Sequence, residues 1–428
     1  MSFSQLQDSI IEPGLCTHCG TCVGMCPVGC IEFGSDGKQE PQLVGDCIEC
    51  NICTKVCPGK EVSFKELGKD VFGSFGSNFE LGEFQELNLG HSLDDGIREG
   101  GASGGVVTDI LVSLLEQGVI DGALVTGMKK DEPWVPEPVI ARAKIEILEC
   151  AQSKYVVSPT NICLKKLREN SGKFAVVALP CQVHGLRKAI ELDNKLKERV
   201  HCIIGLYCGN ILHPSAVDSW IKRSGIRKED IQKFEFRGDD WPGNIKISSK
   251  KGAVFRINKF ISNYVIPFHI LGRCLYCIDM TNEFADLSVG DGWKYESEDR
   301  KGWSIIVIRS QRGSKIMGLV SDHLKIERIT VDDALMMHSH GLDLKKNGAM
   351  IRIAHAHRKG KPVPEYGVEY VEPLRKRLIK ERLFMIFIRV ASTRVGRWLI
   401  DVVPLSVVGF AFVSLRKYWM KSTKKKSD

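Results

Sequence analysis

The sequence predicts a multidomain α+β and α/β protein: a small cysteine-rich domain comes first, a mixed α/β domain follows, and a basic helical tail ends the chain. Three observations lead to this prediction. Nine of the 16 cysteines lie between residues 16 and 57, strand-like apolar runs alternate with helix-like runs in the middle of the chain, and residues 374–428 hold 14 Lys and Arg. Strands that alternate with helices are typical of a largely parallel sheet.

Composition and charge narrow the class of protein. Of the 428 residues, 43% are hydrophobic and 26% are charged, which excludes a disordered or collagen-like chain. The formal net charge is +8, but residues 374–428 alone carry +11, because only Glu381, Asp401 and Asp428 oppose their 14 basic residues. The rest of the chain is slightly acidic, which argues against a body that binds nucleic acid.

The first residues, MSFSQLQDSIIEPG, contain no basic segment followed by an apolar run. We therefore expect no export signal in them and a cytoplasmic location for the protein. Cysteines that cluster in such a reducing compartment are metal ligands more often than disulfides.

Two cysteine motifs define the first domain, residues 1–65. CTHCGTCVGMCPVGC at 16–30 and CIECNICTKVCP at 47–58 each contain C-x2-C-x2-C-x3-C-P, the pattern of bacterial ferredoxins. In that pattern, three cysteines of one run and the fourth cysteine of the other run bind each [4Fe-4S] cluster. The expected ligands are Cys16, Cys19, Cys22 and Cys57 for the first cluster, and Cys26, Cys47, Cys50 and Cys53 for the second.

Structural zinc is the alternative for these motifs. Zinc sites use C-x2-C pairs and do not need a third cysteine in series with a distant fourth, so clusters explain the pattern better. Cys30 lies outside the pattern and is expected to be a small buried hydrophobic residue. Most of the chain follows this domain, so we expect the clusters to serve another site.

A glycine-rich turn marks the second domain, residues 66–345. REGGASGG at 98–105 precedes VVTDILVSLLEQGVIDG, whose apolar residues form one helical stripe. Backbone N–H groups at a helix start suit a phosphate, so a nucleotide diphosphate is a candidate ligand of Gly100, Gly101, Ala102, Ser103, Gly104 and Gly105. The turn matches neither the dinucleotide fingerprint nor the Walker sequence, and glycines required only for packing are the alternative.

Four cysteines of the second domain are candidate ligands of a third cluster. KFAVVALPCQVHGLRKA predicts a strand, a turn with Cys181 and a helix, and VHCIIGLYCGN predicts a strand that ends at Cys208. GRCLYCIDM adds Cys274 and Cys277. Ligands gather beyond the carboxyl ends of parallel strands, and four thiolates suffice for a cluster. The alternatives are buried thiols and a zinc pair.

Together these segments resemble the beta subunits of the coenzyme F420 hydrogenase and dehydrogenase family. The matching stretches run in the family's order over about residues 66–345: EGGASGGVVTDIL, EPWVPEPVIARAKIEILECAQSKYVVSP, FAVVALPCQVHGLRKA, IIGLYCGN, FRGDDWPG, CLYCIDMTNEFADLSVGDGW and GWSIIVIR. The resemblance implies bound FAD, coenzyme F420 as the substrate, and a third [4Fe-4S] cluster on Cys181, Cys208, Cys274 and Cys277. It also implies that the GGASGG turn and Ser153, Lys154 and Tyr155 contact FAD.

Single residues in the matching stretches carry narrower expectations. Lys154 is expected beside the flavin or its phosphates, with an ordinary surface lysine as the alternative. His184 is expected to tune the cluster or relay a proton, with a hydrogen-bonded core histidine as the alternative. Asp286, Asp291 and Trp293 are expected in the wall of the active site.

The predicted function is an iron-sulfur flavoprotein oxidoreductase. Coenzyme F420 moves two electrons as a hydride and each cluster moves one, and a flavin can exchange both. Electrons are expected to run between coenzyme F420, FAD, the three clusters and a ferredoxin or a redox partner subunit. The alternatives are a ferredoxin-dependent reductase of another organic substrate and a non-catalytic electron-transfer subunit of a larger complex.

The third segment, residues 346–428, is a proline-bearing linker and a basic amphipathic extension. Its uncharged run at 402–415 has 14 residues, short of the roughly 20 that span a bilayer. Apolar stretches bordered by Arg389, Arg394 and Trp398 suit a helix at an anionic membrane surface, which predicts a peripheral position at the inner face of the cell membrane. Helices packed on the body or on another subunit are the alternative.

Overall fold

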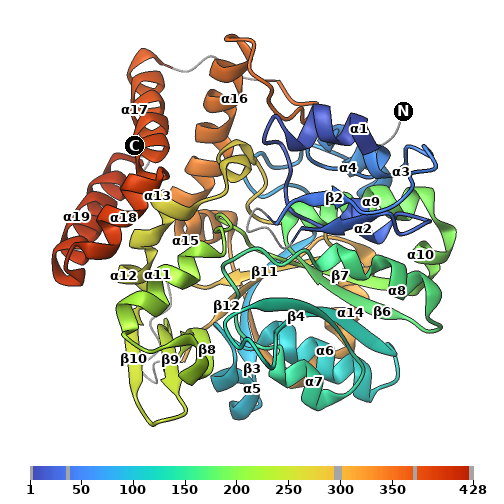
Figure 1. The fold of residues 1–428 in the computed structure, drawn as a ribbon. Helices are drawn as coiled ribbons and strands as arrows, with labels where there is room; N and C mark the ends of the chain where they lie inside the picture. The colour runs from blue at the N-terminus through green and yellow to red at the C-terminus, as the bar shows by residue number, and fades with distance from the viewer. Residues whose placement is uncertain (1–2, 35–38, 294–300, 370–373, 424–428) are drawn as a thin grey trace.

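The fold is built on an eight-stranded sheet that crosses the middle of the molecule (Figure 1). The structure, a computed structural model, describes residues 3–34, 39–293, 301–369 and 374–423. The strand order is β13-β3-β12-β11-β7-β6-β4-β5. Its strands are β3 (Glu86–Ser92), β4 (Gly122–Met128), β5 (Pro136–Ala141), β6 (Phe174–Ala178), β7 (Val200–Leu206), β11 (Leu287–Asp291), β12 (Ser304–Ile308) and β13 (Leu324–Arg328).

The sheet is mixed rather than largely parallel. Strands β4, β6, β7 and β11 are parallel neighbours at its centre. Strands β5, β12, β3 and β13 pair with their neighbours in antiparallel fashion and form its two edges. The mixed α/β fold is thus confirmed, while the parallel arrangement holds only where strands alternate with helices along the chain.

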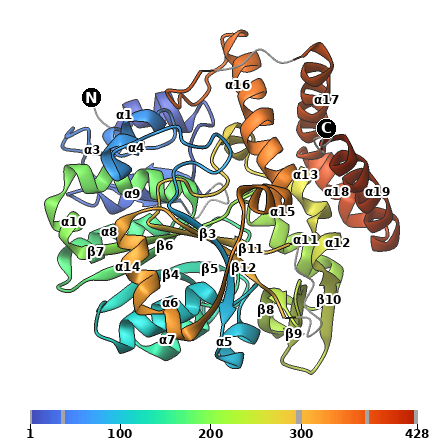
Figure 2. The same ribbon diagram turned by 180° about the vertical axis from the view of Figure 1, so that it is seen from behind.

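Helices cover both faces of the sheet (Figures 1 and 2). Because successive strand residues point to opposite faces, Ala123 and Val125 pack with one helical layer and Leu124 and Val176 with the other. One layer contains α5 (Asp95–Gly100), α6 (Val106–Glu116), α7 (Lys144–Glu149), α14 (Gln311–Leu319) and η6 (Ser321–His323). The other contains η2 (Thr160–Cys163), α8 (Leu164–Glu169), α9 (Pro180–Leu192) and α10 (Asn194–Arg199).

The N-terminal module packs on the layer that contains α9. The Asn161 side chain donates a hydrogen bond of 2.8 Å to Thr21 Oγ1, and Lys188 on α9 donates one of 3.1 Å to the Cys57 carbonyl. The module contains α1 (Phe3–Leu6), η1 (Gln7–Ile11), α2 (Thr21–Gly24), β1 (Ile31–Phe33), β2 (Pro41–Leu43), α3 (Ile52–Lys55) and α4 (Phe64–Phe72).

A second, three-stranded antiparallel sheet stands beside the main sheet (Figure 1). Its core joins Phe234 and Ile245 to Trp220 of the helix that precedes it. The strands are β8 (Ile231–Gly238), β9 (Asn244–Ser249) and β10 (Val254–Asn258). Its neighbours are α11 (Ser215–Ser224), η3 (Lys228–Asp230), α12 (Lys259–Ser262), η4 (Asn263–Val265), α13 (Ile266–His269) and η5 (Gly272–Tyr276).

The body of the protein continues beyond residue 345. Met350 and Ile353 of α16 belong to the core that packs under the main sheet, and Tyr366 of the linker is buried there too. Arg273 Nη1 donates a hydrogen bond of 2.9 Å to Tyr366 Oη. The C-terminal helices are α15 (Val331–Asp343), η7 (Leu344–Gly348), α16 (Ala349–His357), α17 (Arg375–Ala391), α18 (Arg394–Val402) and α19 (Leu405–Thr423).

One face of the tail helices packs on the body. Arg352 of α16 pairs with Glu381 of α17, with 2.6 Å between Nη1 and Oε2. Arg397 donates a hydrogen bond of 2.8 Å to the carbonyl of Phe268. Among the described residues, no single helix has the length and hydropathy of a membrane span, and α18 with the first part of α19 reaches that hydropathy only as a pair bent by 113°.

Candidate functional site

The first predicted ligand set comes together in the N-terminal module. Burial, and then the neighbouring thiols, raise the pKa of Cys16 and Cys22 well above the usual thiol value. Burial raises the pKa of Cys57 to about 12, and the thiol of Cys19 adds to this rise. The fold therefore brings Cys57 of the second run close to the thiols of the first run.

The second set surrounds a small cavity lined by Cys26, Cys47, Cys50 and Cys53. Cys30 lines the same cavity, and its Sγ lies 3.6 Å from Cys26 Sγ. Cys30 is buried, as expected, but it also contacts a candidate ligand, which the ferredoxin pattern does not reveal. The only indication of this contact in the sequence is that Cys30 follows Cys26 closely.

The third set also converges, although its members lie far apart in the sequence. Cys181 lies in the first turn of α9, Cys208 follows β7, and Cys274 and Cys277 lie in and just after η5. Burial raises the pKa of Cys208 to about 12, and the nearby thiols of Cys274 and Cys277 add to this rise. Ile211 N donates a hydrogen bond of 3.4 Å to Cys274 Sγ.

The donor chemistry of all three sets fits iron-sulfur clusters. Buried thiols this close to one another can ionise only where positive charge compensates them, and iron supplies such charge. No three His, Cys, Asp or Glu side chains in the described part of the chain are close enough to hold a single metal ion. Sulfurs spread around a space suit a four-iron cluster better than one zinc ion.

A buried lysine faces the third set. Lys345 in η7 is only 2% exposed. Burial lowers its pKa, but the thiols of Cys277, Cys208 and Cys274 outweigh burial, so the pKa is raised above the usual lysine value. Sequence reasoning missed this residue, because a Lys-Lys pair normally indicates a solvated surface.

The three sets follow one another in space. Cys181 of the third set lies against the first set, with its Sγ 4.0 Å from the carbonyl of Thr17 and Cys19 as its strongest thiol neighbour. Cys22 of the first set interacts in turn with Cys53 of the second. Cys50, at the far end of this row, is exposed.

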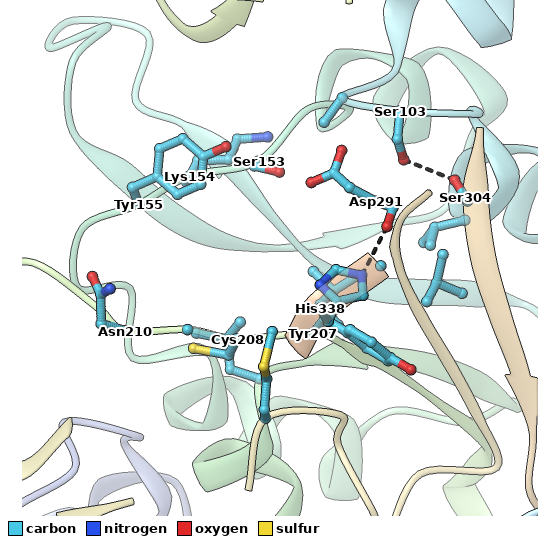
Figure 3. A pocket seen from close by; sticks show the side chains of 18 of the residues that line it. Ser103, Ser153, Lys154, Tyr155, Tyr207, Cys208, Asn210, Asp291, Ser304 and His338 are labelled. Carbon is cyan, nitrogen blue, oxygen red and sulfur yellow. Dashed lines mark hydrogen bonds between the residues drawn. The ribbon is translucent and has the colours of Figure 1, made fainter. Parts of the chain in front are cut away.

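A cavity of about 1410 Å³ lies beyond the carboxyl ends of the four parallel strands. Thr126, Leu179, Cys208 and Asp291 line it where β4, β6, β7 and β11 end. Figure 3 shows Lys154 and Tyr155 on one side of it and Ser103 and Asp291 on the other. Its volume exceeds the roughly 300–1,000 Å³ of a pocket for one drug-sized ligand.

The glycine-rich turn serves both packing and the cavity. Gly101, Ala102, Ser103 and Gly105 line the cavity at the start of α6, whereas Gly100 ends α5 outside it. A side chain at Gly104 would meet the Gly90 carbonyl at 2.6 Å, so this glycine is required by packing. The Val106 end of α6 directs its N–H groups toward the cavity wall, which suits an anionic group.

Ser153, Lys154 and Tyr155 all line the cavity. The Lys154 ammonium is already engaged: it donates hydrogen bonds of 2.6, 2.7 and 3.1 Å to the carbonyls of Cys150, Ala151 and Gln152. Burial lowers its pKa to about 8. Lys154 is therefore no ordinary surface lysine, and its direct task is to close the C-terminal end of α7.

Arg237 of β8 lies behind the cavity wall and binds residues that line the cavity, and sequence reasoning missed it. It is 2% exposed, and it donates hydrogen bonds to Tyr155 Oη at 3.1 Å, Asp291 Oδ1 at 3.0 Å and the Ala102 carbonyl at 2.6 Å. One guanidinium thus joins the glycine-rich turn, β11 and the segment after α7. Burial raises the pKa of Tyr155, but the charges of Arg237 and Lys259 outweigh burial and lower it.

Other expected wall residues divide between the cavity and the core. Asp291 and Trp293 line the cavity. Asp286 instead accepts a hydrogen bond of 2.8 Å from Ile203 N in the core. His184 is 2.9 Å from Asp279 Oδ2 and is buried, so it is the hydrogen-bonded core histidine of the two alternatives.

Polar atoms of the wall fit a polar ligand. In the described part of the protein, Ser158 Oγ and Trp220 Nε1 are buried without a hydrogen-bond partner, and both residues line the cavity. Buried polar groups normally find a partner. Together with the helix start at Val106 and the size of the cavity, they fit a large cofactor with phosphate groups, such as FAD.

Comparison with protein families assigns most of the chain. Residues 88–165 match the N-terminal model, and residues 171–334 the C-terminal model, of the coenzyme F420 hydrogenase/dehydrogenase beta subunit. Residues 8–58 match the 4Fe-4S dicluster domain.

Curated relatives share the cysteine module or the body. The chain is 30% identical over 329 residues to the coenzyme F420-dependent sulfite reductase of Methanocaldococcus jannaschii, covering 73% of this chain but only 47% of that protein. It is 28% identical over 336 residues to one of the subunits of the F420H2 dehydrogenase of Methanosarcina mazei, covering 74% and 85% of the two chains. It is 29% identical over 249 residues to the beta subunit of coenzyme F420 hydrogenase of Methanothermobacter thermautotrophicus, covering 55% and 81%.

One solved structure shares the fold. A chain of the F420-reducing [NiFe] hydrogenase complex of Methanosarcina barkeri matches with a TM-score of 0.52 and 23% identity, covering 64% of this chain and 94% of that one.

Proposed function

The chain belongs to the family of coenzyme F420 hydrogenase/dehydrogenase beta subunits and carries a 4Fe-4S dicluster domain, and from this we propose that it is a coenzyme F420-dependent oxidoreductase. In this proposal FAD occupies the cavity and exchanges a hydride with coenzyme F420. Single electrons then pass through the body cluster and the two N-terminal clusters, to or from a ferredoxin or a redox partner subunit. The family resemblance seen in the sequence is confirmed. FAD and the third cluster are part of the proposed function.

One observation carries the proposal: Cys208 belongs both to the wall of the cavity and to the third set of thiols. A flavin in the cavity supplies the exchange between a hydride and single electrons. The chain contributes position and charge around it. Arg237 holds three parts of the cavity wall together. The start of α6 suits the phosphate groups of the proposed FAD. Cys208 connects the third set of thiols to the cavity.

The second set of thiols lies at the exposed end of the row, and the surface beside it is suited to bind a protein partner. Val28 and Ile48 line the cavity of the second set and are exposed to solvent, as is Cys50. Asp46 and Glu49 stand on the same loop and are exposed as well. We propose that a one-electron carrier or partner subunit binds here, because this exposed face lets its own redox centre come close to the second cluster.

Anaerobic mixing with reduced coenzyme F420 tests the proposal. Purified, iron-replete protein should show rapid loss of flavin absorbance near the visible maximum, followed by slower bleaching of the cluster absorbance. Replacement of Cys208 by Ser should preserve the flavin step and suppress reduction of the N-terminal clusters, since the link between the cavity and the row of clusters is lost.

Other outcomes would point to the alternatives. Flavin that stays oxidised with coenzyme F420 but bleaches with reduced ferredoxin would indicate a ferredoxin-dependent reductase of another substrate. Flavin and clusters that respond to neither donor, at full cofactor content, would indicate a non-catalytic electron-transfer subunit.

A further inference from the structure

The two helices α17 and α18 each expose an apolar stripe to solvent. The exposed residues recur at helical spacing of three and four, so they form one face of each helix. The stripe of α17 consists of Ile379, Leu383, Ile386, Phe387 and Val390, and that of α18 of Val395, Trp398, Leu399 and Val402. Val407 and Phe410 continue the exposed apolar surface onto α19. We call these residues together the outer stripe.

The opposite faces of the same helices are fixed to the body. On α17, Ile388 and Ala391 are buried, and Glu381 accepts hydrogen bonds from Arg352 and Arg377. On α18, Ile400 packs against the core beside the three-stranded sheet. Helices α17 and α18 are therefore already docked on the body through their other faces. This docking fixes the orientation of the outer stripe.

The charge around the outer stripe is positive. Arg375, Lys376, Lys380, Arg389 and Arg394 are exposed on the same helices. Within the described tail, the acidic residues are Glu381, which is buried in ion pairs, and Asp401, which accepts a hydrogen bond from Ser219. The exposed charges of this surface consequently fit an anionic partner.

We propose that the outer stripe binds the surface of an anionic lipid bilayer, with α17 and α18 lying in the interface. Apolar side chains at the boundary, basic side chains toward the headgroups and a tryptophan between them are the composition of such helices. A bend of 113° between α18 and α19 suits attachment along a surface. Figures 1 and 2 show these helices at the edge opposite the N-terminal module, so this module lies on the side away from the proposed bilayer.

Helix α19, which follows the proposed membrane-binding helices, also packs on elements of the cavity wall. Helix α19 packs against α12 and α15, which provide Lys259, Phe260 and Met337 to the lining of the cavity. Gly409 of α19 lies close to Ile261, where an added side chain would meet Cγ2 at 3.1 Å. The bilayer therefore lies next to one side of the proposed cofactor cavity.

Sedimentation of the full-length, iron-loaded protein with vesicles tests the proposal. The protein should pellet with vesicles of mixed phosphatidylglycerol and phosphatidylcholine, should stay in solution with phosphatidylcholine alone, and should be released by salt. Ile386→Glu and Trp398→Glu should each lower the affinity for the anionic vesicles by about tenfold or more.

A matched control separates this surface from general stickiness. Ile145 on α7 is 60% exposed, as Ile386 is, so Ile145→Glu should bind vesicles as the wild type does. The proposal is wrong if the wild type stays in solution with the anionic vesicles, or if Ile145→Glu weakens binding as much as Ile386→Glu. It is also wrong if sedimentation equilibrium shows a dimer that Ile386→Glu dissociates, because a second copy of the chain would then cover the stripe.

Discussion

Two adjacent lysines, Lys345 and Lys346, are both buried but have different charged partners. The Lys346 ammonium forms an ion pair with the buried carboxylate of Glu283, whereas its neighbour Lys345 faces the thiols of Cys208, Cys274 and Cys277. Positive charge next to a cluster stabilises its reduced, more negative state and raises the reduction potential. Lys345 is therefore placed to make the proposed body cluster a better electron acceptor for the proposed flavin.

We expect Lys345→Met to shift the midpoint potential of the body cluster to a more negative value, because one buried positive charge is lost. Iron content should stay at the wild-type level, since Lys345 is not a ligand. A redox titration followed by electron paramagnetic resonance measures the potential. Lys345→Arg keeps the charge and serves as the control; equal potentials for the Met and Arg variants would show that the charge has no influence on the cluster.

Residue roles are the least predictable level. The positions of Ser153, Lys154 and Tyr155 at the cavity agree with the resemblance, yet the three carbonyls that occupy the Lys154 ammonium depend on how α7 ends. The sequence predicts Asp286 in the wall, but this residue lies in the core, because the local sequence does not say which way a side chain beside a strand points.

At the scale of elements, the local sequence is a good guide where one segment determines the structure. The apolar run before Cys181 forms β6, the helix after it is α9, and the run after the glycine-rich turn is α6. The contribution of β8 could not be foreseen in this way. Its residue Arg237 contacts the wall residue Ala102 only because a separate antiparallel sheet stands beside the main one.

Arg237→Gln should weaken flavin binding by roughly 5- to 150-fold, the equivalent of about 1–3 kcal/mol for buried hydrogen bonds that lose their donor. The glycine-rich turn, Tyr155 and Asp291 would no longer share one charged partner. Fluorescence titration of the flavin-free protein with FAD measures the affinity, and the iron content of the variant should not change.

Arg256→Gln is the matched control for this substitution. Arg256 on β10 also pairs with an aspartate, Asp239, at 2.8 Å, but its side chain is half exposed and the pair lies outside the cavity. Exposed ion pairs contribute little, so FAD affinity should equal that of the wild type. Equal losses in both variants would mean that Arg237 acts on the stability of the second sheet and not on the cavity.

At the scale of the whole molecule, the order of the clusters is a property that only the fold defines. The two N-terminal ligand sets follow from the motifs, but no spacing in the sequence places Cys181 next to Cys19 or turns the second set away from the body. The contact arises because the N-terminal module packs on η2 and α9, where Asn161 and Lys188, respectively, bind it. The first ligand set thus stands between the other two.

In the proposed electron route, this order makes the first cluster an obligatory step between the cavity and the exposed end. Cys57→Ser removes one ligand of the first set and leaves all four ligands of the second and third sets in place. After addition of reduced coenzyme F420, the flavin and the body cluster should become reduced while the second cluster stays oxidised. Dithionite should still reduce the second cluster, which shows that it is present, and Mössbauer spectra distinguish the clusters.

Cys50→Ser, at the far end of the row, should leave reduction of the first cluster at the wild-type rate. A second cluster that is reduced equally fast in Cys57→Ser and in the wild type would mean that electrons reach it by a path that bypasses the first cluster.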